Sequence, residues 1–158
     1  MHGSGFGFVA IPRDQAAQLT EITAPIPGME DHYLVGIDVF HQLHCLDLLR
    51  QAVWPDRYNW STSNDKSTQR RTPRHLDHCV DSLRQSLMCS ADISTLHFEW
   101  VPKYHRNYIS AKATHTCRNF EKIRQWTKDK TVPNWDPNIF VEDSLRAAEE
   151  FAASSQLD

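Results

Sequence analysis

Long hydrophobic runs are missing from this chain of 158 residues. The longest candidate, residues 33–53, is interrupted by Asp38, His41, His44, Asp47 and Arg50. Because a membrane-spanning helix needs about 20 mostly apolar residues, this stretch does not cross a bilayer. The start of the chain, Met1-His2-Gly3, has neither the basic residues nor the long apolar segment of a signal peptide. The sequence therefore predicts no transmembrane segment and no signal peptide in this chain.

An excess of charge of either sign is also missing. The chain has 17 Lys and Arg against 20 Asp and Glu, a formal net charge of −3. Nucleic-acid-binding proteins gain much of their affinity by neutralising phosphates with Lys and Arg, so this balance argues against nucleic acid as a partner. Glycine (5) and proline (8) are too few for a disordered or fibrous chain. Length and composition together predict one folded domain.

The short motifs of the common enzyme classes are absent as well. The chain has no GxGxxG or GxxxxGK[ST] loop and no GxSxG nucleophile elbow, which excludes the usual nucleotide-binding sites and the α/β-hydrolase mechanism. HExxH, CxxC and CxxCH are missing too. A hydrolytic zinc site normally needs a carboxylate base beside its histidines, and the histidine motifs described next supply no Glu there.

Histidine, in contrast, is abundant: the chain has nine. Two segments align at an offset of 34 residues, with seven of eleven positions identical: His41-Gln-Leu-His-Cys-Leu-Asp-Leu-Leu-Arg-Gln51 and His75-Leu-Asp-His-Cys-Val-Asp-Ser-Leu-Arg-Gln85. A 34-residue period is that of tetratricopeptide repeats, but there are only two copies, and they lack the Trp/Gly/Tyr signature. We therefore interpret the pattern as a duplicated helix.

The spacing of these histidines indicates a metal site. Residues three apart on a helix are surface neighbours, so His41 and His44 can reach one ion, as can His75 and His78. In each helix the pair points away from the main apolar stripe, and two such helices facing each other would gather four imidazoles. A single HxxH pair is more often surface or core histidine, but its duplication favours metal binding. Imidazole suits zinc, copper, iron and nickel, so ligand type alone does not name the metal.

Each copy also carries a cysteine directly after its second histidine, Cys45 and Cys79. These thiols can serve as accessory ligands, as buried small residues or as halves of disulfides. Four cysteines allow three pairings, and we favour Cys45–Cys79, which joins equivalent positions, together with Cys89–Cys117. The glycosylation sequon at 59–61 weakly supports an oxidising secretory lumen, where disulfides form.

Several other side chains stand out. His115 is a further accessory candidate because it lies two residues before Cys117. The isolated histidines are expected to be structural or solvent-facing: His32, His97 and His105. Four aromatic residues are interpreted as core more readily than as a substrate pocket: Phe98, Trp100, Tyr104 and Tyr108. Two ion pairs at i, i+3 spacing are expected on solvated faces: Asp47–Arg50 and Asp81–Arg84.

The first half of the chain is predicted to contain an arm and two helices. Residues 1–31, rich in Gly and Pro, are expected to be extended, with one short strand at 6–11. A helix is predicted at 37–53. A second helix opens at Thr72-Pro73, since Thr is a good cap and Pro suits the first turn. Its apolar stripe is formed by Leu76, Val80, Leu83 and Leu87.

The second half is less regular. Residues 91–112 are interpreted as loop with short strands, and helices are predicted at 114–129 and 142–153, separated by a turn-rich linker at 132–137. The predicted fold class is mainly α, a single small domain built around two HxxHC helices, with an extended N-terminal arm and short strands. Its segments are the arm (1–31), the metal-binding core (32–130) and the linker with the C-terminal helix (131–158).

Three segments carry a family resemblance: Val39-Phe-His-Gln-Leu-His-Cys-Leu46, His75-Leu-Asp-His-Cys-Val-Asp-Ser-Leu-Arg-Gln-Ser-Leu-Met-Cys-Ser-Ala-Asp92 and His115-Thr-Cys-Arg-Asn-Phe120. Together they closely resemble the UstYa-type family of fungal mycotoxin biosynthesis, over about residues 5–130. The paired HxxHC motif is the signature of that family, and both copies are complete here.

The resemblance implies a copper-dependent oxidase of fungal secondary metabolism that functionalises C–H or phenol positions by cyclisation, hydroxylation, desaturation or halogenation. It implies that the catalytic metal is held by the two motifs, here His41, His44, Cys45, His75, His78 and Cys79. The implied partners are a small-molecule or peptide substrate and a family paralogue or second copy in an oligomer. Two alternatives stay open: a non-catalytic scaffold for an active paralogue, and a structural zinc-binding module.

The resemblance also bears on location. Typical members begin with a cytoplasmic tail and one membrane-spanning helix before a lumenal domain, whereas this chain starts at the lumenal domain. The expected location is therefore the secretory-pathway lumen or a membrane, and the absence of a span in this chain leaves a soluble protein open.

Overall fold

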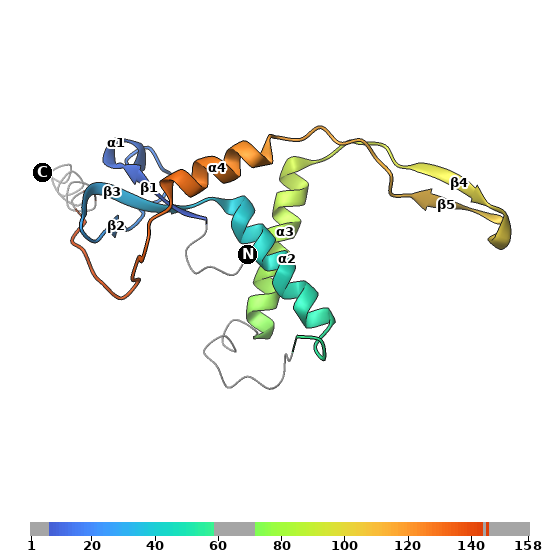
Figure 1. Ribbon diagram of the computed structural model, residues 1–158, viewed down its shortest axis with the longest axis horizontal. Helices are drawn as coiled ribbons and strands as arrows, with labels where there is room; N and C mark the ends of the chain where they lie inside the picture. The colour runs from blue at the N-terminus through green and yellow to red at the C-terminus, as the bar shows by residue number, and fades with distance from the viewer. Residues whose placement is uncertain (1–6, 59–71, 144, 146–158) are drawn as a thin grey trace, which may run out of the picture. The chain divides into compact units, whose positions relative to one another are not determined.

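The computed structural model describes residues 7–58, 72–143 and 145, and it is mixed α/β (Figure 1). Four α-helices alternate with a three-stranded and a two-stranded sheet in the described part of the chain. The predicted fold class, mainly α in a single small domain, is therefore wrong. The chain divides into two compact units: unit 1 is Met1–Leu43 with Glu121–Asp158, and unit 2 is His44–Phe120.

Unit 1 is built on an antiparallel sheet with strand order β1-β3-β2. Strand β1 (Phe8–Pro12) pairs with β3 (Met29–Gly36) from Phe8↔Gly36 to Pro12↔His32, and β2 (Pro25–Ile26) lies on the other edge of β3. The short helix α1 (Arg13–Ala16) follows β1 directly. The strand predicted at 6–11 is confirmed, but the rest of the arm, where described, is folded into this sheet. Its strand partners are distant in sequence, and local patterns do not show them.

The core of unit 1 consists of two small clusters on this sheet. One contains Ile11, Ala16 and Tyr33, and the other contains Ile26, Leu34 and Val132. Val132 also donates its backbone N–H to the Phe8 carbonyl at 3.4 Å, so the segment after the last helix joins the edge of β1. Gly7 has a φ of +105°, and a Cβ there would lie 2.9 Å from the Phe40 Cβ, so this turn requires glycine.

Helix α4 (Phe120–Lys130) starts later than predicted. Residues 114–119 are not helical, since their Thr, His, Cys and Asn side chains have low helix propensity. Thr127 is fully buried and donates its hydroxyl to the Ile123 carbonyl at 2.9 Å. The helix predicted at 142–153, most of the 55–72 connection and the sequon at 59–61 lie outside the described residues.

Unit 2 contains most of helix α2 (Asp38–Val53), helix α3 (Pro73–Ser90) and a β-hairpin. Both helices start where the sequence predicts. The Thr72 hydroxyl accepts the backbone N–H of His75 at 3.3 Å, Pro73 opens the first turn, and α3 ends at Ala91 in the left-handed conformation. The predicted short strands are β4 (His97–Val101) and β5 (Arg106–Ser110), joined through the 3₁₀ turn η2 (Pro102–Tyr104). Across the ranges with described coordinates, no helix is long and apolar enough to span a membrane.

Candidate metal centre

The sequence repeat is also a structural repeat. Helices α2 and α3 run in opposite directions and pack against each other (Figure 1). Their contact is centred on Cys45 and Cys79, which are both 0% exposed and cluster with Leu48. Leu49 and Leu83, also equivalent positions of the repeat, pack against this cluster half-buried. The two copies therefore meet through matching residues, as in a helix pair with an approximate two-fold axis.

The apolar stripe predicted for α3 is only partly buried. Val80 and Leu87 are exposed, and the buried residue of this helix is Cys79. Position 79 precedes 80 by about 100° around the helix. The small cysteine therefore faces the partner helix and allows close approach, which hydropathy alone assigns to the larger side chains.

The polar residues of the repeat make the same contacts in both copies. Asp47 accepts hydrogen bonds from Arg50 at 2.6 Å and from Gln51 at 2.7 Å. Asp81 accepts from Arg84 at 2.7 Å and from Gln85 at 2.6 Å. The bond from Arg84 is the main reason that the pKa of Asp81 is lowered. Both predicted i, i+3 ion pairs are thus confirmed.

Three of the four motif imidazoles converge within unit 2. The ring centroids of His44 and His75, on different helices, are 6.3 Å apart, and those of His75 and His78 are 6.2 Å apart. Both pairs are edge-to-face. The fourth, His41, lies one helical turn before His44 on α2, and its Nδ1 is 3.6 Å from Oδ1 of Asp38. Asp38 also accepts from the Gln42 amide, so the carboxylate is placed to orient the His41 ring.

The donor set was tested against the geometry of a bound ion. Two imidazoles that share a metal at about 2.0–2.1 Å per nitrogen place their ring centroids roughly 4.5–6.4 Å apart, depending on the angle at the metal. The observed distances lie at the upper end of this range. Within the described residues, accordingly, no three His, Cys, Asp or Glu side chains are already close enough to hold an ion. The ligand chemistry fits a metal such as copper, and rotation of the exposed rings would have to close the site.

The buried position of the motif cysteines favours one of their three interpretations. Cys45 and Cys79 lie between the helices in an apolar cluster, where a small residue allows close packing. Cys89 and Cys117 are exposed. Cys79, Cys89 and Cys117 carry free thiols in the structure, so neither predicted disulfide is formed there and the pairing is not confirmed.

We nevertheless expect the purified chain to contain two disulfides, Cys45–Cys79 and Cys89–Cys117. The first two cysteines share one buried cluster, and the contact between Asp92 and His115 brings the flanks of the other two together. Thiol titration under denaturing, non-reducing conditions should detect almost no thiol, and the same titration after reduction should detect all four. Loss of either bridge should cost about 2–5 kcal/mol. Two or more reactive thiols before reduction would contradict this pairing.

His115 has a partner that the sequence did not reveal. Its Nδ1 lies 2.5 Å from Oδ2 of Asp92, 23 residues earlier. Asp92 also accepts the backbone N–H of Ser94 at 2.8 Å. The hydrogen bonds to Ser94, followed by the one to His115, lower the pKa of Asp92 to about 2. The Asp-x-Ser spacing was a readable signal for the turn, but nothing local pointed to His115. This pair joins the two chain segments that lead into the hairpin.

The hairpin aromatics lie on an exposed ribbon. Register places Phe98 and Trp100 on one face with Ile109, while Tyr108 lies on the other, with Arg106 stacked 4.8 Å from its ring centroid. Their interpretation as core is therefore wrong. His97 and His105 are solvent-facing as predicted, and His97 contacts Glu99 at 2.9 Å.

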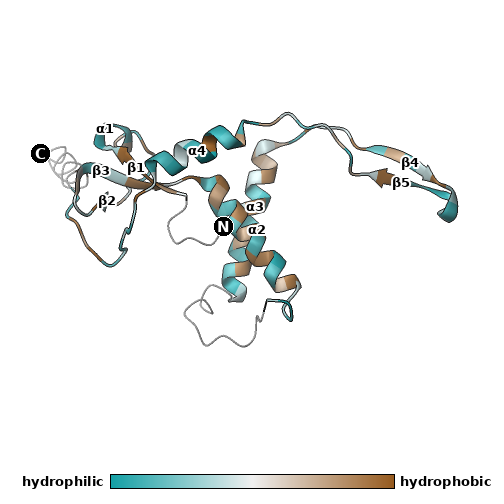
Figure 2. Cartoon of the chain, in the orientation of Figure 1, coloured by the Kyte–Doolittle hydropathy of each residue, from teal (hydrophilic) through white to brown (hydrophobic). Residues whose placement is uncertain are grey.

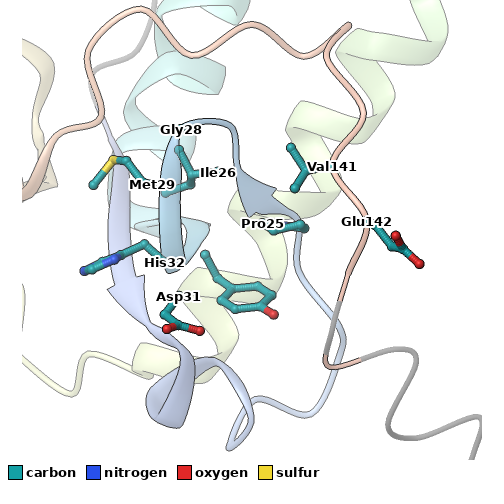
Figure 3. A pocket seen from close by; sticks show the side chains of 9 residues that line it. Pro25, Ile26, Gly28, Met29, Asp31, His32, Val141 and Glu142 are labelled. Carbon is teal, nitrogen blue, oxygen red and sulfur yellow. The ribbon is translucent and has the colours of Figure 1, made fainter.

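Two cavities were measured, both in unit 1. One, of about 330 Å³, is lined at the sheet by Ile26, Met29 and His32 and on its other side by Val141 and Glu142 (Figure 3). The other, of about 490 Å³, shares His32. Neither is lined by a motif histidine or by a hairpin aromatic residue, so these cavities add nothing to the candidate metal centre.

Comparison with known proteins gives a consistent result. The family described as "Mycotoxin biosynthesis protein UstYa" matches residues 1–130. The UstYa family oxidase phomYc' of Diaporthe leptostromiformis is 37% identical over 65% of this chain and 41% of its own length. The oxidase ustYa of Aspergillus flavus is 33% identical over 81% of this chain and 55% of its own. The transacylase cctO of Talaromyces islandicus is 32% identical over 67% and 38%. No solved structure matches the chain.

Proposed function

We propose, since this chain belongs to the UstYa family, that it contributes the metal-binding part of a copper-dependent oxidase of fungal secondary metabolism. The chain spans less than half the length of the phomYc' protein, so the activity of the whole protein belongs to the proposal. One observation carries it: three imidazoles from both halves of the repeat converge within 6.3 Å on adjacent helices.

Each residue of the candidate centre has a role in the proposal. His44, His75 and His78 hold the ion, and His41 supplies a fourth imidazole, oriented by Asp38. Cys45 and Cys79 hold the two helices together from the buried side. His44 and His78 are exposed, which keeps the centre accessible to a substrate. The Asp47 and Asp81 networks rigidify the outer faces of the helices that carry the ligands.

The choice of copper follows from the chemistry of the donors and the reaction. Oxidation of a C–H or phenol position needs a redox-active metal, which excludes zinc. Neutral imidazoles bind Cu(II) well, and a bound copper ion would supply the one-electron chemistry that no side chain provides. The substrate class is a small molecule or peptide of a biosynthetic pathway. Two relatives are named oxidases, which supports an oxidative outcome.

Metal analysis with electron paramagnetic resonance after copper loading tests this proposal. We expect one or two copper ions per chain and the spectrum of Cu(II) in a nitrogen-rich environment. The variant His97→Ala serves as the matched control, because His97 is an exposed histidine on the hairpin that contacts Glu99 rather than a motif histidine. Stoichiometric zinc with no copper signal would contradict the oxidase and favour a structural zinc module. Bound copper without turnover would favour the scaffold for an active paralogue.

A further inference from the structure

Unit 2 buries very little apolar surface. In its described part, the buried hydrophobic residues are Cys45, Leu48 and Cys79. Small folding units with so few buried side chains usually need additional support, such as disulfides, a metal or oligomerisation. The helices also carry hydrophobic residues on their exposed surfaces (Figure 2). The question is which partner covers them.

The exposed hydrophobic residues occupy equivalent positions of the repeat. Leu46 is 55% exposed and its equivalent Val80 is 53% exposed. Val53 is 69% exposed and its equivalent Leu87 is 73% exposed. We call these four residues the apolar quartet. The duplicated helices therefore repeat a hydrophobic surface as well as the histidines.

The quartet lies on one face of the helix pair, opposite the imidazoles. At about 100° per residue, positions 46 and 53 lie roughly 80–100° around α2 in one direction from Cys45, and position 44 lies about 100° in the other. The same holds on α3 for positions 80, 87 and 78 relative to Cys79. Because the two helices are antiparallel and face each other through these cysteines (Figure 1), equal rotations fall on the same face of the pair. One face thus carries the histidines and the other the quartet.

We propose that the apolar quartet is the surface through which two copies of this chain associate. A patch with its own approximate two-fold symmetry is self-complementary, as an isologous dimer interface requires. Two antiparallel helix pairs stacked through such faces form a four-helix arrangement. With their immediate neighbours Trp54 and Met88, which are 61% and 68% exposed, the four side chains offer several hundred Å², against roughly 800 Å² per partner in a standard interface.

Charge at the border of the quartet favours a second copy over a lipid surface. The neighbouring polar side chains form the ion pairs Asp47–Arg50 and Asp81–Arg84, so both signs are present in equal number. An anionic bilayer attracts a surface bordered by basic residues alone. In a dimer, by contrast, the carboxylate of one copy can face the guanidinium of the other. The proposal goes beyond the metal site and leaves the histidine face open.

Sedimentation velocity of the full chain over a wide concentration range tests the proposal. We expect a species of twice the 18.3 kDa chain mass. The double variant Leu46→Glu/Val80→Glu should raise the dimer dissociation constant at least tenfold. The control Ile93→Glu places the same charge on a 93% exposed residue of unit 2 outside the quartet, and it should dimerise like the wild type.

Two further measurements keep the test decisive if the double variant folds poorly. Copper loading reports on the opposite face, so a folded variant should bind copper like the wild type. A photo-crosslinking residue at position 46 of the otherwise unchanged chain should link two copies, and one at position 93 should not. A wild type that stays monomeric at all concentrations would overturn the proposal, as would a double variant that dimerises like Ile93→Glu. A monomer that binds lipid vesicles through position 46 would assign the quartet to a membrane instead.

Discussion

Replacing any one motif histidine with alanine is expected to abolish oxidative turnover and to weaken copper binding by roughly 100-fold or more, since loss of an outer-shell partner alone costs 10–100-fold. The four variants are His41→Ala, His44→Ala, His75→Ala and His78→Ala. The motif imidazoles are at least partly exposed, whereas the helix contact depends on Cys45, Leu48 and Cys79. The far-UV circular dichroism of each variant should therefore match that of the wild type.

The matched controls for this prediction come from the other histidines. His97→Ala and His105→Ala remove exposed imidazoles from the hairpin region, and both should bind copper like the wild type. Affinity is measured by titration with a competing chelator, and turnover is measured with the metabolite of the neighbouring biosynthetic genes. If all four motif variants keep wild-type affinity and turnover, the metal site lies elsewhere and the proposed function fails.

The second large effect is expected at Leu48. Leu48→Ala should lower the free energy of unfolding by about 2–5 kcal/mol, because it removes a large side chain from the buried cluster and leaves a cavity. Leu48 is 6% exposed and packs with Cys45 and Cys79. Urea unfolding followed by circular dichroism measures the change. Leu83→Ala, for which the helical stripe alone predicts a similar cost, should have a smaller effect because Leu83 is only half-buried.

Ile93→Ala is the control for the stability measurement. Ile93 is almost fully exposed, and exposed substitutions usually change stability by less than about 0.5 kcal/mol. Copper loading of the Leu48→Ala variant at a temperature where it is folded should be unchanged, since no ligand is removed. A Leu48→Ala protein as stable as the Ile93→Ala protein would show that the Cys45–Cys79 contact does not hold the two helices together.

The sequence alone determined the features of this protein that depend on neighbouring residues. The start of α3 follows from a capping threonine and a first-turn proline, both within one helical turn. The pairing of Asp47 with Arg50 follows from i, i+3 spacing, which any helix brings together. The duplicated HxxHC motif, and with it the family, needs no tertiary structure to be found.

Only the tertiary structure decided the features that depend on distant partners. The first 31 residues are interpreted from their sequence as an arm because their partner strand β3 extends to Gly36, and the pairing Phe8↔Gly36 spans 28 residues. Asp92 meets His115 across a whole hairpin. The rotation of α2 against α3 is likewise a property of the pair. Close packing at two small cysteines outweighs the larger side chains, so it buries Cys79, exposes Val80 and turns three histidines toward one another on the opposite face.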